Sequence, residues 1–155
     1  MPRWSDWKRF KWRFKNEKLN REEVRRTLPG EGQFVYELGI KPVRGKEKIR
    51  TVYVGHGRAE RMSRDHLGWI DHAGAERFQA KTGPYMKKTI RNGFEVYIRY
   101  MDCRDNLTAI SAEERLIGTF WWKYPWNDAG MPWAGARKYY KEVAGGLYTK
   151  VSSLE

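Results

Sequence analysis

Two short segments, each with a tyrosine and each rich in β-forming residues, constrain the fold of this chain more than any other feature. They are residues 33–38 (QFVYEL) and 50–55 (RTVYVG), and residues 41–50 between them are mostly polar and basic. Such a pair is typical of two strands joined by a flexible loop. Gly55 ends the second segment where a helical pattern begins, over residues 57–66. The sequence therefore predicts a β-hairpin followed directly by a short helix.

The chain after this unit predicts a helix, a third strand and a last helix. Residues 84–92 suit a helix with proline in its first turn and a glycine directly after its end. Residues 94–101 alternate apolar and polar side chains, which favours a strand. After a loop at 102–109, residues 111–122 predict the last helix. We therefore expect an α/β domain of the α+β kind, with a small three-stranded, mostly antiparallel sheet flanked by helices.

The N-terminal segment combines aromatic and basic side chains. Residues 3–27 hold ten Lys and Arg against four Asp and Glu. Trp4, Trp7, Phe10 and Phe14 recur at a spacing of three and four, which predicts an aromatic stripe along one face of a helix. Two interpretations stay open and are compatible: a helix packed on the domain, or an arm that lies along a phosphate backbone.

The expected organisation has three parts. Residues 1–29 form a basic, aromatic helical arm, which ends where Pro29 and Gly30 break the helical pattern. Residues 30–128 form the core. Residues 129–155, rich in Gly, Pro and small residues, form a C-terminal extension that packs on the core.

Length and charge narrow the functional classes. A chain of 155 residues suits one domain, and a net charge of +12 indicates a polyanionic partner, with nucleic acid first and an anionic membrane surface second. The many aromatic residues suit core packing or stacking on bases. The single cysteine, Cys103, excludes an internal disulfide and a thiolate metal cluster. The lack of a long apolar run or a signal-peptide core leads us to expect an intracellular, cytoplasmic protein.

The order of these motifs resembles the GIY-YIG endonuclease superfamily, and in pattern the small phage-encoded GIY-YIG endonucleases. Tyr36 in Phe34-Val35-Tyr36 resembles the first motif, and Tyr53-Val54-Gly55 the second. Arg61 resembles the arginine of the following helix. Glu114 stands thirteen residues before Asn127, which follows Pro125-Trp126, and these two resemble the glutamate and asparagine of the family's last motif.

Two positions depart from the family pattern. The glycine and isoleucine that open the first motif are replaced, and Asp65 stands where the family usually has His or Tyr, with His66 beside it. The helix segment after Gly55 is also shorter than usual. Arg58 and Arg64 therefore remain alternatives to Arg61.

The resemblance implies a Mg²⁺-dependent endonuclease that hydrolyses phosphodiester bonds in double-stranded DNA. One Mg²⁺ or Mn²⁺ ion would bind to Glu114, with waters and substrate phosphate filling its remaining positions. Tyr36 would accept a proton from the attacking water in a cationic pocket that favours its phenolate, and Arg61 would neutralise the phosphate. Tyr53, Asn127 and His66 are further candidate catalytic residues. The candidate DNA-binding residues are Arg58, Arg64, Lys81, Lys87 and Lys88.

Each of these residues also has a structural interpretation. Tyr36 and Tyr53 suit a cross-strand packing pair, Arg61 a solvated helix charge, and Asn127 a turn cap. Ser111 and Glu114 match a capping box, with Ser111 as N-cap.

Alternatives at the level of function also stay open. A metal site made by His66 and His72 is disfavoured, because no third ligand stands at a useful spacing. The alternative functions are a sequence-specific restriction or homing endonuclease, and a non-catalytic DNA- or RNA-binding protein. Double-strand cleavage by one small active site favours a homodimer, and the pattern suits a phage-encoded enzyme acting in a bacterial host.

Overall fold

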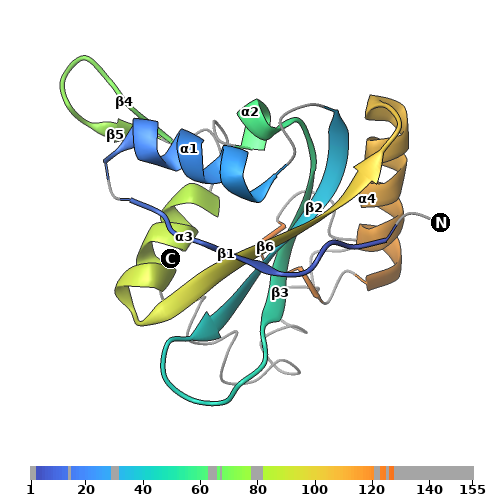
Figure 1. Cartoon of the computed structure of the whole chain (residues 1–155), viewed down its shortest axis with the longest axis horizontal. Helices are drawn as coiled ribbons and strands as arrows, with labels where there is room; N and C mark the ends of the chain where they lie inside the picture. The colour runs from blue at the N-terminus through green and yellow to red at the C-terminus, as the bar shows by residue number, and fades with distance from the viewer. Residues whose placement is uncertain are drawn as a thin grey trace.

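The computed structural model describes residues 3–13, 15–28, 32–62, 66, 68–77, 82–120, 123, 124, 126 and 127. Within these residues the elements follow one another as β1 (Lys8–Phe10), α1 (Glu17–Thr27), β2 (Gln33–Pro42), β3 (Arg50–Gly57), α2 (Ala59–Met62), β4 (Trp69–Ile70), β5 (Glu76–Arg77), α3 (Thr82–Arg91), β6 (Phe94–Cys103) and α4 (Asn106–Phe120) (Figure 1). The C-terminal extension predicted at 129–155, with Arg64 and Lys81, lies outside the described residues. No helix in the described part of the chain is long and apolar enough to cross a membrane.

A four-stranded antiparallel sheet in the order β1-β6-β2-β3 forms the centre of the fold. This confirms the predicted α+β class and the β2–β3 hairpin, and the central pairing of β2 with β6 is antiparallel as well. The predicted number of strands is too low, because β1 joins the sheet at its edge beside β6. A second, two-stranded sheet of β4 and β5 was also not predicted.

The N-terminal segment is not a helix over its aromatic residues, and that prediction is wrong for residues 8–10. Phe10 and Trp12 are buried while Arg9, Lys11 and Arg13 are exposed, which is the alternation of an extended chain. A spacing of two therefore places the apolar side chains in the core, and pairing with β6 provides hydrogen-bond partners for backbone groups of β1. Helix formation begins only at Glu17, where the side chain of Asn16 accepts a hydrogen bond from the Leu19 amide.

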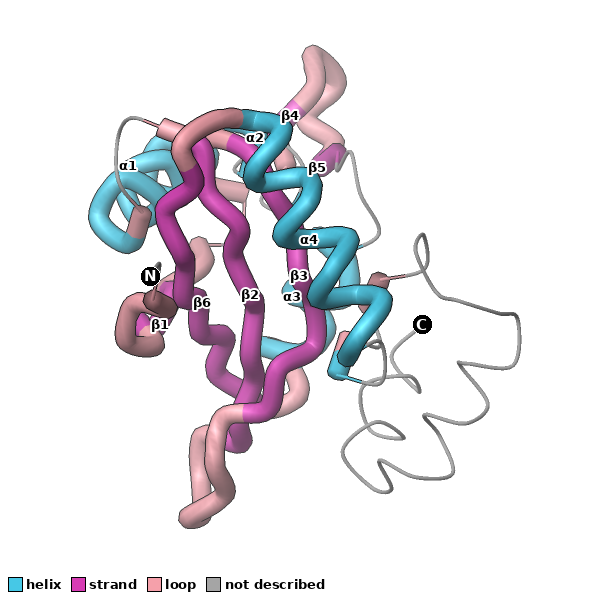
Figure 2. Tube along the Cα trace, turned by 90° about the vertical axis from the view of Figure 1, so that its right-hand side faces the viewer, coloured by secondary structure: helices cyan, strands magenta, loops and turns pink. Residues whose placement is uncertain are grey.

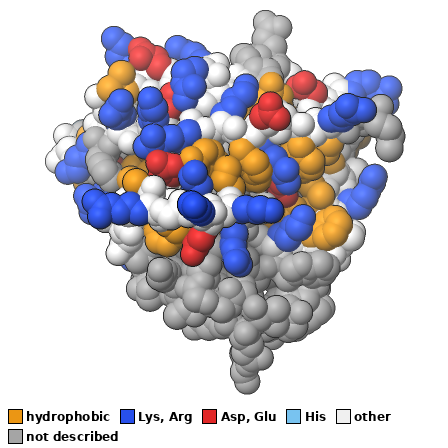
Figure 3. Space-filling model, turned by 60° about the horizontal axis from the view of Figure 1, so that its bottom comes forward, with side chains coloured by type: hydrophobic (Ala, Val, Ile, Leu, Met, Phe, Trp, Pro, Cys, Tyr) orange, Lys and Arg blue, Asp and Glu red, His pale blue; other side chains and the backbone are white. Residues whose placement is uncertain are grey.

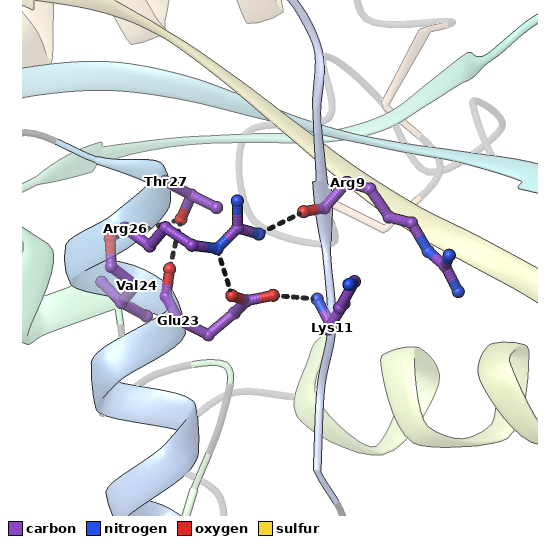
Figure 4. Close-up of polar contacts among 6 residues, drawn as sticks. All are labelled: Arg9, Lys11, Glu23, Val24, Arg26 and Thr27. Atoms are coloured by element: carbon purple, nitrogen blue, oxygen red, sulfur yellow. Dashed lines mark hydrogen bonds and ion pairs between the residues drawn. The ribbon is translucent and has the colours of Figure 1, made fainter.

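Side chains of α1 hold the edge strand in place, as Figure 4 shows. Glu23 accepts a hydrogen bond from the backbone N–H of Lys11 at 2.5 Å, and Arg26 donates to the carbonyl oxygen of Arg9 at 3.0 Å. Arg26 also donates to the Glu23 carboxylate, and the pKa of Glu23 is lowered by these hydrogen bonds, although partial burial raises it. These contacts bind polar groups of an exposed strand edge that would otherwise be open to another chain.

Several aromatic residues of the N-terminal segment stack on a buried ion pair. The guanidinium of Arg99 lies 4.8 Å from the Trp4 ring centroid and 4.5 Å from that of Trp7. Arg99 also donates to the buried carboxylate of Glu37 at 2.7 Å. Tyr124 donates to the same carboxylate, and its pKa is raised by burial and by the charge of Glu37. In this part of the chain the aromatic residues serve packing.

The two faces of the sheet carry separate cores. On one face Phe34, Tyr36, Leu38 and Ile40 pack with side chains from α1, α2 and α3. On the other face Val35 and Val54 pack against α4. Figure 2 shows α4 lying over the face formed by β2 and β3. Adjacent residues of β2 and β3 therefore point into different environments, which decides where each candidate site residue lies.

The start of α4 differs from the prediction. The helix begins at Asn106, where Asp105 accepts a hydrogen bond from the Thr108 amide at 2.7 Å, so Ser111 lies inside the helix. The capping box of Ser111 and Glu114 is therefore wrong, since a helix interior has no free amides to cap. The predicted helix at 84–92 is confirmed by α3, whereas α2 begins at Ala59, two residues after the predicted start at 57.

Candidate active site

The hairpin brings Tyr36 directly opposite Gly55. The Tyr36 ring lies against the β3 backbone there, because a Cβ on Gly55 would come within 2.6 Å of the Tyr36 hydroxyl and 2.9 Å of Tyr53 Cε1. The tyrosine of one strand thus requires the glycine of the other. This contact gives a physical reason for a Tyr-x-Gly motif across from a tyrosine.

The Tyr36 hydroxyl belongs to a short buried network. It lies 2.5 Å from His66 Nε2, and His66 Nδ1 contacts the Thr82 hydroxyl at the start of α3. Tyr53 packs edge-on against the same imidazole, with 4.9 Å between ring centroids. Burial first, and then the charge of Arg61, lower the pKa of His66 to about 3. His66 is therefore neutral at physiological pH, with one ring nitrogen as donor and the other as acceptor.

Arg61 belongs to α2 and lies beside this network. Its aliphatic stem packs over Gly57, where a Cβ would lie 3.1 Å from Arg61 Cδ. Gly57 has a φ of 132°, in the region that favours glycine. The Arg61 side chain is exposed, and its Nη1 lies 3.4 Å from Nε2 of His56.

A second polar pair lies on the α4 side of β3. His56 follows Gly55 on the strand and therefore points to the opposite face. Its Nδ1 contacts the Glu113 carboxylate of α4, and both side chains are partly exposed. Sequence reasoning missed His56, Glu113 and Thr82. The only available signal was for His56, a polar residue that directly follows the Tyr-x-Gly motif.

Glu114 is exposed on α4, next to Glu113. Among the described residues its carboxylate has no hydrogen-bond or ion-pair partner. The described residues also contain no group of three or more side chains suited to hold a metal ion. A single unpaired carboxylate fits Mg²⁺ only if waters and substrate phosphate supply the other ligands, an arrangement that this ion adopts. The residues present fit that mode of binding.

Asn127 lies apart from these groups, on the outer edge of β3. Its side-chain amide donates to the Val54 carbonyl and accepts from the Val54 amide, each at 2.9 Å. The backbone N–H of Trp126 donates to the Val52 carbonyl, also at 2.9 Å. Asn127 thus replaces a neighbouring strand along β3 and fixes the strand that carries Tyr53, Gly55 and His56.

The candidate DNA-binding residues are scattered in the described part of the chain. Arg58 and Lys88 are exposed, whereas Lys87 pairs with Glu76. His72 lies exposed in the turn between β4 and β5. On the face drawn in Figure 3, Lys and Arg side chains spread over the described surface with hydrophobic side chains between them. The structure therefore brings together Tyr36, Tyr53, His66 and Arg61, and it places Asn127 against the β3 backbone at Val54. Among the described residues no contact joins Lys87 or Lys88 to these groups.

Comparison with known proteins gives no relative. No family model, no curated protein and no solved structure matches this chain.

Proposed function

We propose that this chain is a Mg²⁺-dependent endonuclease that hydrolyses phosphodiester bonds in double-stranded DNA. One observation carries the proposal: Arg61 of α2, an exposed cation whose stem packs over the last residue of β3, lies beside two histidine-centred networks on opposite faces of that strand. Hydrolysis of a phosphodiester needs a cation at the phosphate and a nearby group that takes a proton from water. Arg61 of α2 and the residues of β3 bring both kinds of group into one small region.

Arg61 is the arginine best placed to bind the phosphate. Its guanidinium reaches His56 Nε2 and its charge acts on His66, so it lies within the cluster, whereas no contact joins Arg58 to these groups among the described residues. A guanidinium offers two parallel N–H donors to a phosphate and holds it in a fixed orientation. The net charge of +12 supports attraction of the DNA toward this site.

Glu114 is the residue that would hold the metal ion. A bound Mg²⁺ supplies Lewis-acid stabilisation of the negative charge that develops on the phosphate oxygens. The chain's own contribution is an exposed carboxylate with no hydrogen-bond or ion-pair partner among the described residues, on the helix that also supplies Glu113. The contact between Glu113 and His56 fixes this part of α4 against the end of β3.

The direct test is incubation of supercoiled plasmid with the purified chain. Nicking or linearisation in Mg²⁺ that stops on addition of a chelator supports the proposal. If the chain shifts the plasmid in a gel-shift assay but does not cleave it in Mg²⁺ or Mn²⁺, this result would instead favour a non-catalytic DNA-binding protein. A defined fragment pattern would favour a sequence-specific enzyme.

A further inference from the structure

We propose that His56, held by Glu113 and facing Arg61, is the group that accepts the proton from the attacking water. This inference rests on the proposed nuclease function and adds a catalytic residue to it. His56 Nδ1 contacts the Glu113 carboxylate, and its Nε2 lies 3.4 Å from Arg61 Nη1. The imidazole thus has one nitrogen fixed by a carboxylate and the other turned toward the phosphate-binding arginine.

Access to solvent separates His56 from Tyr36. The side chains of His56 and Glu113 are 17% and 21% exposed, whereas Tyr36 is 2% exposed and its partner His66 is fully buried. A proton acceptor must reach the attacking water directly or through one further water. His66, with a pKa of about 3, is also a weak acceptor for a proton passed on by Tyr36. Tyr36, His66 and Thr82 then form the rigid support behind the site.

The contact with Glu113 determines which nitrogen of the His56 imidazole carries the proton. The carboxylate accepts a hydrogen bond from Nδ1–H, which leaves the lone pair of the neutral ring on Nε2. A carboxylate that orients a histidine base in this way also stabilises the imidazolium after proton transfer. Within the described part of the chain, Arg61 is the other charged side chain in contact with His56. When Arg61 turns to a bound phosphate, Nε2 is left beside that phosphate.

The step balances without a further reactant. The water oxygen forms a bond to phosphorus, and its proton passes to His56 Nε2. The bond from phosphorus to the leaving oxygen breaks, and that oxygen takes a proton from solvent. His56 then returns its proton to solvent, so the protein is unchanged at the end of the cycle.

The experiment measures single-turnover cleavage of a duplex in Mg²⁺ as a function of pH. We compare the wild-type chain with His56→Gln, Glu113→Gln, Tyr36→Phe and the control His72→Gln, which changes an exposed histidine of the β4–β5 turn. Affinity for the duplex without Mg²⁺ and the thermal unfolding midpoint are measured for each variant. These two readouts separate loss of chemistry from loss of binding or folding.

The expected loss of rate for His56→Gln is about 10²-fold or more, because a positioned base contributes roughly 10²–10⁴-fold. The shape of the pH–rate profile should change in His56→Gln, which lacks the base, and it should match that of the wild-type chain in Tyr36→Phe at whatever rate that variant retains. Exogenous imidazole should restore part of the activity of His56→Ala, which leaves the space of the ring empty.

The outcomes distinguish failure of the proposed role of His56 from failure of the proposed nuclease function. A wild-type chain that cuts DNA, together with a His56→Gln variant that cuts with the same rate and pH profile, would overturn the role of His56 and leave the nuclease function intact. A pH–rate profile that changes in Tyr36→Phe but not in His56→Gln would do the same. If His56→Gln does not fold, absence of imidazole rescue in a folded His56→Ala overturns the role. Absence of wild-type cleavage would overturn both proposals.

Discussion

The contact between Tyr36 and Gly55 predicts that Gly55→Ala is strongly destabilising. The new methyl group would lie 2.6 Å from Tyr36 Oη, 2.7 Å from Tyr36 Cζ and 2.9 Å from Tyr53 Cε1, so the two rings must move. Overpacking of a core costs about 1–3 kcal/mol. Displacing the hydroxyl also breaks its hydrogen bond to buried His66, which adds about 1 kcal/mol. We expect a loss of about 2–4 kcal/mol, or roughly 4–16 °C in Tm for a domain of this size.

Urea and thermal unfolding, followed by circular dichroism, measure this loss. Gly118→Ala is the matched control, because Gly118 lies in α4 with no atom within 4 Å of an added Cβ, and helix propensity predicts a gain of up to about 1 kcal/mol. In a Tyr36→Phe background Gly55→Ala should cost less, since the ring is no longer bound to His66 and can tilt away. A Gly55→Ala variant as stable as wild type would refute the close packing of Tyr36 on β3.

Three further predictions concern charge, hydrogen bonding and pH. Glu114→Gln should fold and bind DNA as wild type does but should not cut, because an amide cannot replace the carboxylate that holds Mg²⁺; gel-shift and plasmid assays check this. Asn127→Ala should lower the free energy of unfolding in urea by about 2–4 kcal/mol, because both backbone groups of Val54 lose their partner. The pKa of His66 is about 3 in the folded chain and near 6.5 when unfolded, so the unfolded state binds the extra proton. The free energy of unfolding should therefore be highest above about pH 6.5, and it should fall by up to about 1.4 kcal/mol per pH unit toward pH 3. Urea titrations measure this fall, which should be smaller for His66→Gln.

Local patterns in the sequence predicted the central elements correctly. The hairpin of β2 and β3, helix α3 and strand β6 each carry their own turn residues and periodicity, and each forms close to its predicted bounds. The prediction for the N-terminal segment failed because its aromatic residues fit both the helical spacing and the alternation of a strand. Phe10 satisfies both the helical spacing and the alternation with Arg9 and Lys11, and only the free edge of β6 decides for the strand.

The candidate site shows the same limit at the level of side chains. The pairing of Tyr36 with Gly55 follows from the hairpin register, so the motif order indicated it. The contact of His56 with Glu113 joins residues 57 positions apart, and it depends on how α4 lies on β3. No local pattern carries that information. The start of α4 was misplaced because Asp105 and Ser111 are both suitable N-caps, and the structure uses Asp105, which accepts a hydrogen bond from the Thr108 amide.

The central claim is that Arg61 holds the scissile phosphate of DNA in a Mg²⁺-dependent nuclease site. The most direct test is single-turnover cleavage of supercoiled plasmid in Mg²⁺ by the wild-type chain, Arg61→Gln and Arg58→Gln. Arg58 is an exposed arginine three residues before Arg61 and serves as the matched control for loss of one positive charge. We predict that wild type cuts, that Arg61→Gln is slower by about 10²-fold or more, and that Arg58→Gln stays within a few-fold of wild type. Equal rates for Arg61→Gln and wild type, or no wild-type cleavage in Mg²⁺ or Mn²⁺, would contradict the claim.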